Sequence, residues 1–156
     1  MTEGTWTPKR GATSAPYRYS PAARFRPKRP IRSFRDLGIY QSTNRIAVEI
    51  MTHVVPGMPD ESSLKPALAD CCLTIPHLIA EAHSRRFDDK AKSMTLLEEA
   101  LFLCNKVVVY LEQAREVHRE QVDRVLADEC IKQYGFARQK VFNFYKAWKR
   151  FAAEDT

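Results

Sequence analysis

Four long segments of this chain repeat apolar residues at alternating steps of three and four, and this spacing restricts the fold more than any other feature. The pattern is typical of a helix that packs one face against other helices. It runs through residues 36–54, 63–87, 90–117 and 120–152, and none of these segments shows strand-like alternation. We therefore predict an all-α, up-down four-helix bundle over residues 34–152.

The spacing also predicts which residues of each segment face inward. These residues are Ile39, Ile46, Ile50 and Val54 in the first segment; Leu64, Leu68, Cys71, Ile75, Leu78 and Ala82 in the second; Met94, Leu97, Leu101, Cys104, Val108 and Leu111 in the third; and Cys130, Tyr134, Ala137, Val141, Phe144, Trp148 and Phe151 in the fourth. We predict that these four apolar stripes form the core of the bundle.

Prolines, glycines and acidic residues predict where the helices end or bend. Residues 56–59 hold two prolines and a glycine, and they close the first helix because a proline disfavours helix in the residue before it. Pro76 lies inside the second helix and predicts a kink. Asp88 or Asp89 is the expected N-cap of the third helix. Gly135, inside the fourth, is expected to mark a close contact between helices.

Residues 1–33 differ in composition from the rest of the chain. They contain five of the nine prolines and two of the five glycines, and Arg, Ser and Thr fill half of the remaining positions. Such a segment cannot bury enough apolar surface to offset the entropy lost on ordering it. We therefore predict a disordered, Arg/Pro-rich basic arm over residues 1–33.

The net charge of +6 is concentrated at the start of the chain. Residues 1–35 carry a charge of +8, so residues 36–156 carry −2. Cations of the arm can neutralise phosphates, and the aromatic residues interleaved with them can stack on unpaired bases. The expected stacking residues are Tyr17, Tyr19 and Phe25.

A second basic segment lies in the last helix, where no acid occurs between residues 136 and 151. Together, the two segments give the predicted nucleic-acid-binding residues: Arg18, Arg24, Arg26, Lys28, Arg29, Arg32, Arg35, Arg138, Lys140, Lys146, Lys149 and Arg150. Neither segment requires this function. A basic arm can serve solubility or non-specific adhesion alone, and cations in the last turn of a helix are favoured by its dipole whatever the function.

The apolar faces of the third and fourth helices are wider than a monomeric bundle needs. Leu96 and other residues widen the apolar stripe of the third helix, and further residues widen that of the fourth. Exposed apolar area of this kind usually marks a protein interface. We therefore predict self-association, and the expected interface residues are Leu103, Val107, Tyr110, Phe142 and Tyr145.

Several short motifs resemble one known family. Phe34-Arg35-Asp36-Leu37 followed by Tyr40-Gln41 is similar to the opening of the small four-helix-bundle proteins encoded in intervening sequences of bacterial large-subunit ribosomal RNA genes. Ile75-Pro76 and Ile79-Ala80-Glu81, then Arg85-Arg86 and a long leucine-rich helix, continue the match. The resemblance covers roughly residues 34–150.

The resemblance implies a four-helix bundle assembled as a homopentamer, without enzymatic activity. The same fold serves as the accessory protein of diversity-generating retroelements, where the oligomer binds a reverse transcriptase and nucleic acid. A reverse transcriptase is therefore among the partners that the resemblance implies.

No motif in the sequence indicates catalysis or a bound cofactor. No glutamate has a histidine three residues later, the spacing that places two di-iron ligands on one helix face. His77 and Glu81 share a face but have no complementary pair elsewhere. No Gly-rich phosphate loop, GxSxG elbow or HExxH motif occurs. We predict no catalytic residue, no metal, no cofactor and no enzyme activity.

The cysteines and the hydropathy bear on the compartment. Four Cys at 71, 72, 104 and 130 show no CxxC spacing and lie within helical patterns, which predicts buried free thiols in a reducing compartment. No apolar run approaches the ~20 residues that span a bilayer. No signal-peptide pattern occurs at the N-terminus. The expectation is a cytoplasmic protein with no membrane contact.

These observations predict an oligomeric helical-bundle protein that binds RNA or single-stranded DNA as an accessory or scaffold in a nucleoprotein complex. The alternative from another class is a protein–protein interaction module that uses the apolar faces of the third and fourth helices and has no nucleic-acid role.

Overall fold

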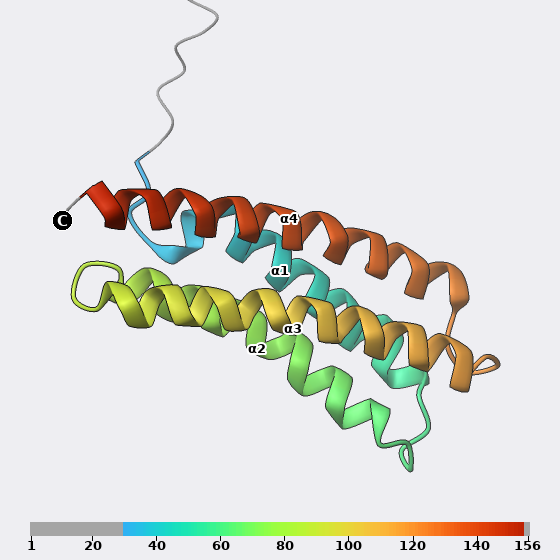
Figure 1. Ribbon diagram of the computed structural model, residues 1–156. Helices are drawn as coiled ribbons and strands as arrows, with labels where there is room; N and C mark the ends of the chain where they lie inside the picture. Colours follow the sequence, from blue (N-terminus) through green and yellow to red (C-terminus); the bar gives the residue numbers. More distant parts are fainter. Residues whose placement is uncertain (1–29, 155–156) are drawn as a thin grey trace, which may run out of the picture. The chain divides into compact units, whose positions relative to one another are not determined.

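In the computed structural model, residues 30–154 can be described and form an all-α four-helix bundle (Figure 1). The long helices are α1 (Gly38–Glu49), α2 (Leu64–Arg85), α3 (Lys90–Val117) and α4 (Arg124–Glu154), and residues 30–154 contain no strand. The predicted fold class is thus confirmed. The chain divides into two units, Met1–Pro30 and Ile31–Thr156. Because the described residues begin at residue 30, the predicted arm lies almost wholly outside them.

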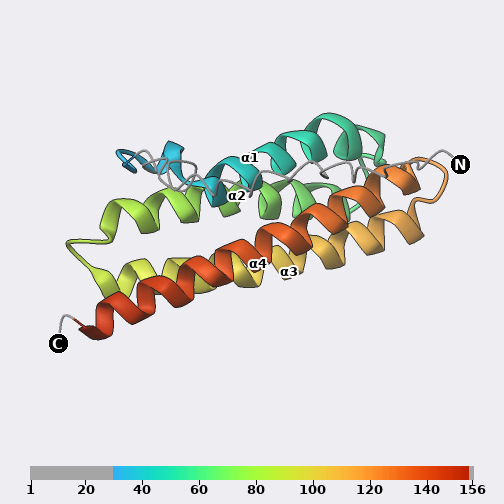
Figure 2. The same ribbon diagram turned by 90° about the horizontal axis from the view of Figure 1, so that it is seen from above.

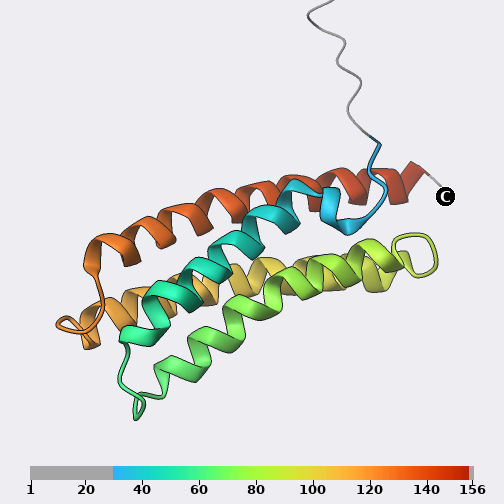
Figure 3. The same cartoon turned by 180° about the vertical axis from the view of Figure 1, so that it is seen from behind.

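The four helices pack in a closed ring of neighbours. α2 packs along α3, α3 along α4, and α1 along both α2 and α4, whereas within residues 30–154 the backbones of the diagonal pairs, α1 with α3 and α2 with α4, do not come close. Successive helices run in opposite directions, as Figures 2 and 3 show. The predicted up-down arrangement follows from this order, because short connections join helices that are also neighbours in space.

The core agrees with most of the predicted stripes. All four predicted residues of the first helix are buried, as are Leu68, Ile75 and Leu78 of α2. α4 contributes Tyr134 and Val141. Leu97, Cys104 and Leu111 of α3 are buried as predicted, whereas Met94, Leu101 and Val108 are only partly buried.

Two predictions about the core are corrected. Leu96 and Val107 were expected on the outward edge of the third stripe, but they are 4% and 0% exposed. They are buried because α3 packs against both α2 and α4, so its apolar face is wider than one stripe. Phe151 was expected in the core and is 65% exposed, because it lies in the last turn of α4, beyond the last fully buried residue of that helix, Val141.

The helix ends differ from the predicted bounds where local geometry decides. The first α-helix ends at Glu49 and continues as a π-helical segment, η3 (Ile50–Val54), and a 3-10 turn, η4 (Val55–Gly57). A short 3-10 helix, η2 (Phe34–Asp36), precedes α1 and is capped by Ser33. The fourth helix begins at Arg124, four residues later than predicted, because residues 118–123 form a loop.

Other local predictions have clear outcomes. Asp89 caps α3, and its carboxylate accepts a 2.9 Å hydrogen bond from the backbone N–H of Lys92. Pro76 is buried inside α2, which changes direction part-way along its length (Figures 1 and 3). The prediction for Gly135 was wrong: apart from the backbone of its own helix, no atom of the described residues lies within 4 Å of a Cβ placed there, so this glycine marks no close contact.

The glycine that does face a close contact is Gly57. A Cβ at this position would lie 2.5 Å from the carbonyl oxygen of Gln121, in the α3–α4 loop. The α1–α2 and α3–α4 loops also meet through a 2.7 Å hydrogen bond between Ser62 Oγ and His118 Nε2. These two loops therefore form one tied end of the bundle.

Candidate nucleic-acid interface

The predicted basic residues fall into two groups. Arg18, Arg24, Arg26, Lys28 and Arg29, together with Tyr17, Tyr19 and Phe25, lie outside the described residues. Arg32 and Arg35 are exposed beside η2, at the end of the bundle where α4 finishes (Figures 1 and 3). The other group lies on α4 itself.

Asp36 holds the start of the bundle in place beside Arg32 and Arg35. Its carboxylate accepts hydrogen bonds from the backbone N–H groups of Arg32, at 2.9 Å, and Ser33, at 3.1 Å. These bonds lower the pKa of Asp36, because they stabilise the charged carboxylate. The Arg35 guanidinium lies 5.7 Å from the centre of the Phe34 ring.

The second half of α4 carries cations that have no acidic partner. Lys140, Lys146, Lys149 and Arg150 are exposed, and none of them forms an ion pair within residues 30–154. The reason is local, because α4 contains no acid between Glu129 and Glu154. Their charge is therefore available to a polyanion.

These cations spread around the outward half of α4 and do not form one row. At 100° per residue, Lys140 lies on the flank next to α1 and Lys149 on the flank next to α3, while Lys146 and Arg150 lie between them and face away from the core. Arg138 differs from the others. It is half-buried beside Cys104 of α3, and its buried Nε has no hydrogen-bond partner within residues 30–154.

Two of the aromatic residues on α4 are covered by its own lysines. Lys146 Nζ lies 4.7 Å from the centre of the Phe142 ring, and Lys149 Nζ lies 5.8 Å from that of Tyr145. The Tyr145 hydroxyl donates a 2.6 Å hydrogen bond to Glu98 of α3. This bond raises the pKa of Tyr145. The two rings thus lie against the basic side chains, and Tyr145 also bonds α4 to α3.

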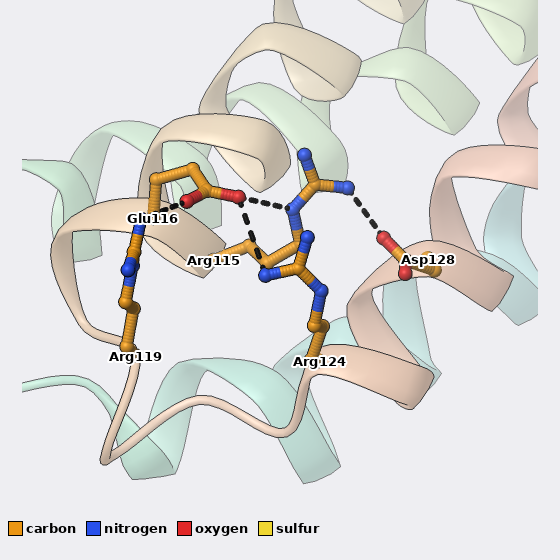
Figure 4. A network of polar contacts seen from close by, with 5 residues as sticks. All are labelled: Arg115, Glu116, Arg119, Arg124 and Asp128. Atoms are coloured by element: carbon orange, nitrogen blue, oxygen red, sulfur yellow. Dashed lines mark hydrogen bonds and ion pairs between the residues drawn. The ribbon is translucent and has the colours of Figure 1, made fainter.

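A third group of cations, at the α3–α4 junction, is fully paired (Figure 4). Arg115 bonds to Asp128 and to Glu116, and Glu116 also accepts a 2.8 Å bond from Arg119. Arg124 lies 3.5 Å from the same Glu116 carboxylate. These contacts lower the pKa of Glu116, the bond from Arg119 most of all. The junction arginines are therefore occupied by acids of the chain itself.

The five residues predicted at an interface between copies do not form one surface. Val107 was a wrong choice, because it has no exposed area and belongs to the core of a single chain. Tyr110 lies near Lys106 on the flank of α3 that borders α2, and Leu103 shares that flank. Phe142 and Tyr145 lie where α4 borders α3. The large apolar side chains that α3 does expose are Phe102, 62% exposed, Val109, 49% exposed, and Val117, 65% exposed at its last residue.

The thiols are held deep in the bundle. All four cysteines are free and buried, as predicted. Burial raises the pKa of Cys72 and Cys104 to about 12 and that of Cys130 to about 11. These groups therefore stay protonated at neutral pH, whereas a nucleophilic or metal-binding cysteine reacts as the thiolate. Tyr134 is fully buried among them, and burial also raises its pKa.

The histidines and acids show no grouping for a metal. Within residues 30–154, no three His, Cys, Asp or Glu side chains are placed to hold a metal ion. His77 is exposed, and His83 is buried, with a pKa lowered by that burial.

Sequence reasoning missed Phe136 and Arg45 as candidate binding residues. Phe136 is 60% exposed on α4, and no cation covers its ring within the described part of the chain. Its position between the core residues Tyr134 and Ala137 places it off the inward stripe, which is a signal that the sequence already contained. Arg45 lies on the facing side of α1, and no sequence pattern links it to α4.

Comparison with known proteins identifies no relative of this chain. No protein-family model, no curated protein and no solved structure matches this chain. None of the helices in the described residues has the length and apolar composition that crossing a membrane requires.

Proposed function

We propose that this protein binds RNA or single-stranded DNA, without enzymatic activity of its own, as an accessory or scaffold in a nucleoprotein complex. The observation that carries the proposal is the set of exposed, unpaired cations on the second half of α4. Phosphates bind such cations with release of condensed counterions, so the affinity falls steeply as salt is added.

The position of the arm in the sequence supports the same proposal. The described chain begins at residue 30, at the end of the bundle where the basic half of α4 also finishes (Figure 1). Residues 1–29, which precede this point in the sequence, carry seven basic residues and one acid, a net charge of +6. Arg32 and Arg35 follow it and are exposed at the same end of the bundle, so their contributions to affinity would combine with those of the α4 cations.

The proposal extends to the family and the assembly. We propose that the chain belongs to the four-helix-bundle proteins of ribosomal RNA intervening sequences, on the motifs within residues 34–41 and 75–86, and that it acts as a homo-oligomer, a pentamer, with a reverse transcriptase as one partner. Light scattering on the full chain distinguishes one copy, at 18.0 kDa, from several.

The main test is a binding titration of a labelled single-stranded oligonucleotide with the full chain. One variant replaces Lys140, Lys146, Lys149 and Arg150 with Gln. We expect its affinity at about 0.15 M salt to fall about 100-fold, and the slope of log K against log salt to become shallower by about 0.7 for each phosphate that the variant no longer neutralises.

The matched control removes the same charge from cations that are already paired. Lys65, Arg85, Arg119 and Arg124 all form ion pairs with carboxylates of the chain. Replacing these four with Gln also lowers the net charge by four, and we expect a much smaller loss of affinity. Equal losses in both variants would show that only total charge matters. No binding by the wild-type chain would refute the proposal itself.

The alternative function, a protein–protein interaction module, is favoured by the exposed Phe102 and Val109 on α3. It predicts that the chain purifies with a stoichiometric protein and that the oligonucleotide titration is flat for the wild type.

A further inference from the structure

The structure contains a hollow of about 460 Å³ between α1 and α4. This volume lies in the range of known small-ligand pockets, about 300–1,000 Å³. The side chains around it that bear on binding are Arg45 of α1 and Gln133, Phe136, Gln139 and Lys140 of α4. The two helices run in opposite directions here, so residues far apart in the sequence face each other across the hollow (Figure 3).

Each of the two helices brings one cation to this α1–α4 groove. Arg45 and Lys140 are exposed, and neither forms an ion pair within residues 30–154. The nearest acids by position are Glu49, one turn after Arg45, and Glu129, one turn before Gln133. Besides burial, the nearby charge of Glu49 raises the pKa of Cys130, and Glu129 accepts a 3.4 Å hydrogen bond from Gln133 Nε2. Both carboxylates therefore lie toward the end of the groove away from Lys140.

The wall of the groove offers an uncovered aromatic ring. Phe136 is 60% exposed, whereas Phe142 and Tyr145 have lysines over their rings. A ring of this kind, between two cations, fits a flat aromatic group attached to a phosphate. Stacking of a base on an aromatic side chain contributes about 1–3 kcal/mol.

The groove also offers a hydrogen-bond acceptor without a partner. The side-chain oxygen of Gln133 is buried and unpartnered in the described part of the chain. Because this oxygen has almost no exposed area, the Gln133 side chain has to turn toward the groove before a bound donor can reach it. The bond then removes the free-energy cost that a buried polar atom without a partner carries. The amino and imino groups on the Watson–Crick edge of a base are such donors, and they are accessible only when the base is unpaired.

We propose that the α1–α4 groove binds one unpaired nucleotide of a single-stranded nucleic acid, with the base against Phe136 and its phosphates on Arg45 and Lys140. This inference rests on the proposed function and sharpens it, because it selects single strands over duplexes. RNA and single-stranded DNA share the chemistry, and the test includes both.

The test uses the full chain and one sequence in three forms: RNA, single-stranded DNA and DNA duplex. Each single strand carries one 2-aminopurine, whose fluorescence reports stacking directly. Phe136→Ala is expected to weaken binding of single strands about 10-fold to 100-fold and to abolish the fluorescence change. Duplex binding is expected to stay within about twofold of the wild type. The Arg45→Gln/Lys140→Gln variant is expected to make the salt slope shallower by about 1.4.

The matched control is Phe87→Ala. Phe87 is 78% exposed and lines a separate, smaller hollow with Trp148 and Phe151. Its loss is expected to leave single-strand binding unchanged. Both phenylalanines are exposed, so circular dichroism should show folded variants.

Three results would overturn the proposed nucleotide site in the groove. The first is an equal loss of single-strand affinity for Phe87→Ala and Phe136→Ala, and the second is an unchanged 2-aminopurine signal in Phe136→Ala. The third is equal single-strand binding by the wild type and Phe136→Ala, in which case the proposed function still stands. If the wild type binds no nucleic acid, both fail.

Discussion

The α3–α4 junction and the second half of α4 use basic residues in opposite ways. At the α3–α4 junction, Arg115, Arg119 and Arg124 all bond to Glu116 or Asp128. In the second half of α4, Lys140 and Lys146 bond to no described acid. A count of basic residues does not distinguish these two regions.

The difference lies in what surrounds each cation. The junction brings α3, a loop and the start of α4 together, and acids from two helices meet the arginines there (Figure 4). Exposed pairs of this kind contribute little to stability, but they consume charge that a polyanion would otherwise use. The arginines of the junction therefore hold parts of the bundle together, whereas the cations in the second half of α4 remain available to other molecules.

The largest expected effect concerns the tied end of the bundle. Gly57→Ala places a Cβ 2.5 Å from the Gln121 carbonyl oxygen, so one of the two loops must move. We expect the free energy of unfolding to fall by about 1–3 kcal/mol, as for other overpacked sites. Urea or thermal unfolding of the full chain measures it.

Gly135→Ala is the matched control within α4. No atom lies within 4 Å of the new methyl group, and alanine favours helix, so we expect stability to rise by about 0.5–1 kcal/mol. Neither substitution should change nucleic-acid affinity. A loss of affinity in Gly57→Ala at temperatures where it stays folded would contradict the structural role of this end.

A smaller effect is expected when the junction is converted into free charge. Glu116→Gln/Asp128→Asn releases Arg115, Arg119 and Arg124 from their partners. We expect single-strand affinity to rise about threefold to fivefold for each additional phosphate neutralised at about 0.15 M salt. Fluorescence anisotropy over a salt series measures both the affinity and its slope.

Glu112→Gln/Glu120→Gln is the control for this variant. It changes the net charge by the same amount at exposed acids that form no ion pair within residues 30–154. An equal gain in both variants would mean that pairing does not decide which cations bind, and the contrast between the junction and the second half of α4 would be lost.

The smallest expected effect is the pH dependence of the junction. The pKa of Glu116 is lowered in the folded chain, so its charged form stabilises the fold above pH 4.5, the ordinary pKa of Glu. This contribution is lost as the pH falls through the lowered pKa. The difference in melting temperature between the wild type and Glu116→Gln should be positive at pH 7 and shrink toward zero below about pH 4. A difference that grows on acidification would contradict the pairing.

Sequence spacing predicted the helices well because burial on one helix face imposes a period of 3.6 residues. It failed where two flanks of one helix are buried, as at Val107, and where a helix outlasts its core, as at Phe151. It also placed the tight contact at Gly135, although the glycine with a close neighbour is Gly57. A steric neighbour from a distant loop leaves no trace in the local pattern.

For the candidate site, the sequence alone predicted the cations of the last helix and the absence of acids among them. It could not show that Arg138 is half-buried, that Lys146 and Lys149 cover aromatic rings, or that Arg45 faces Phe136 across a groove. Which residues are charged, and which face of each helix is apolar, are local properties of the chain. Which charges stay unpaired, and which rings stay uncovered, depend on neighbours that only the packing of the four helices supplies.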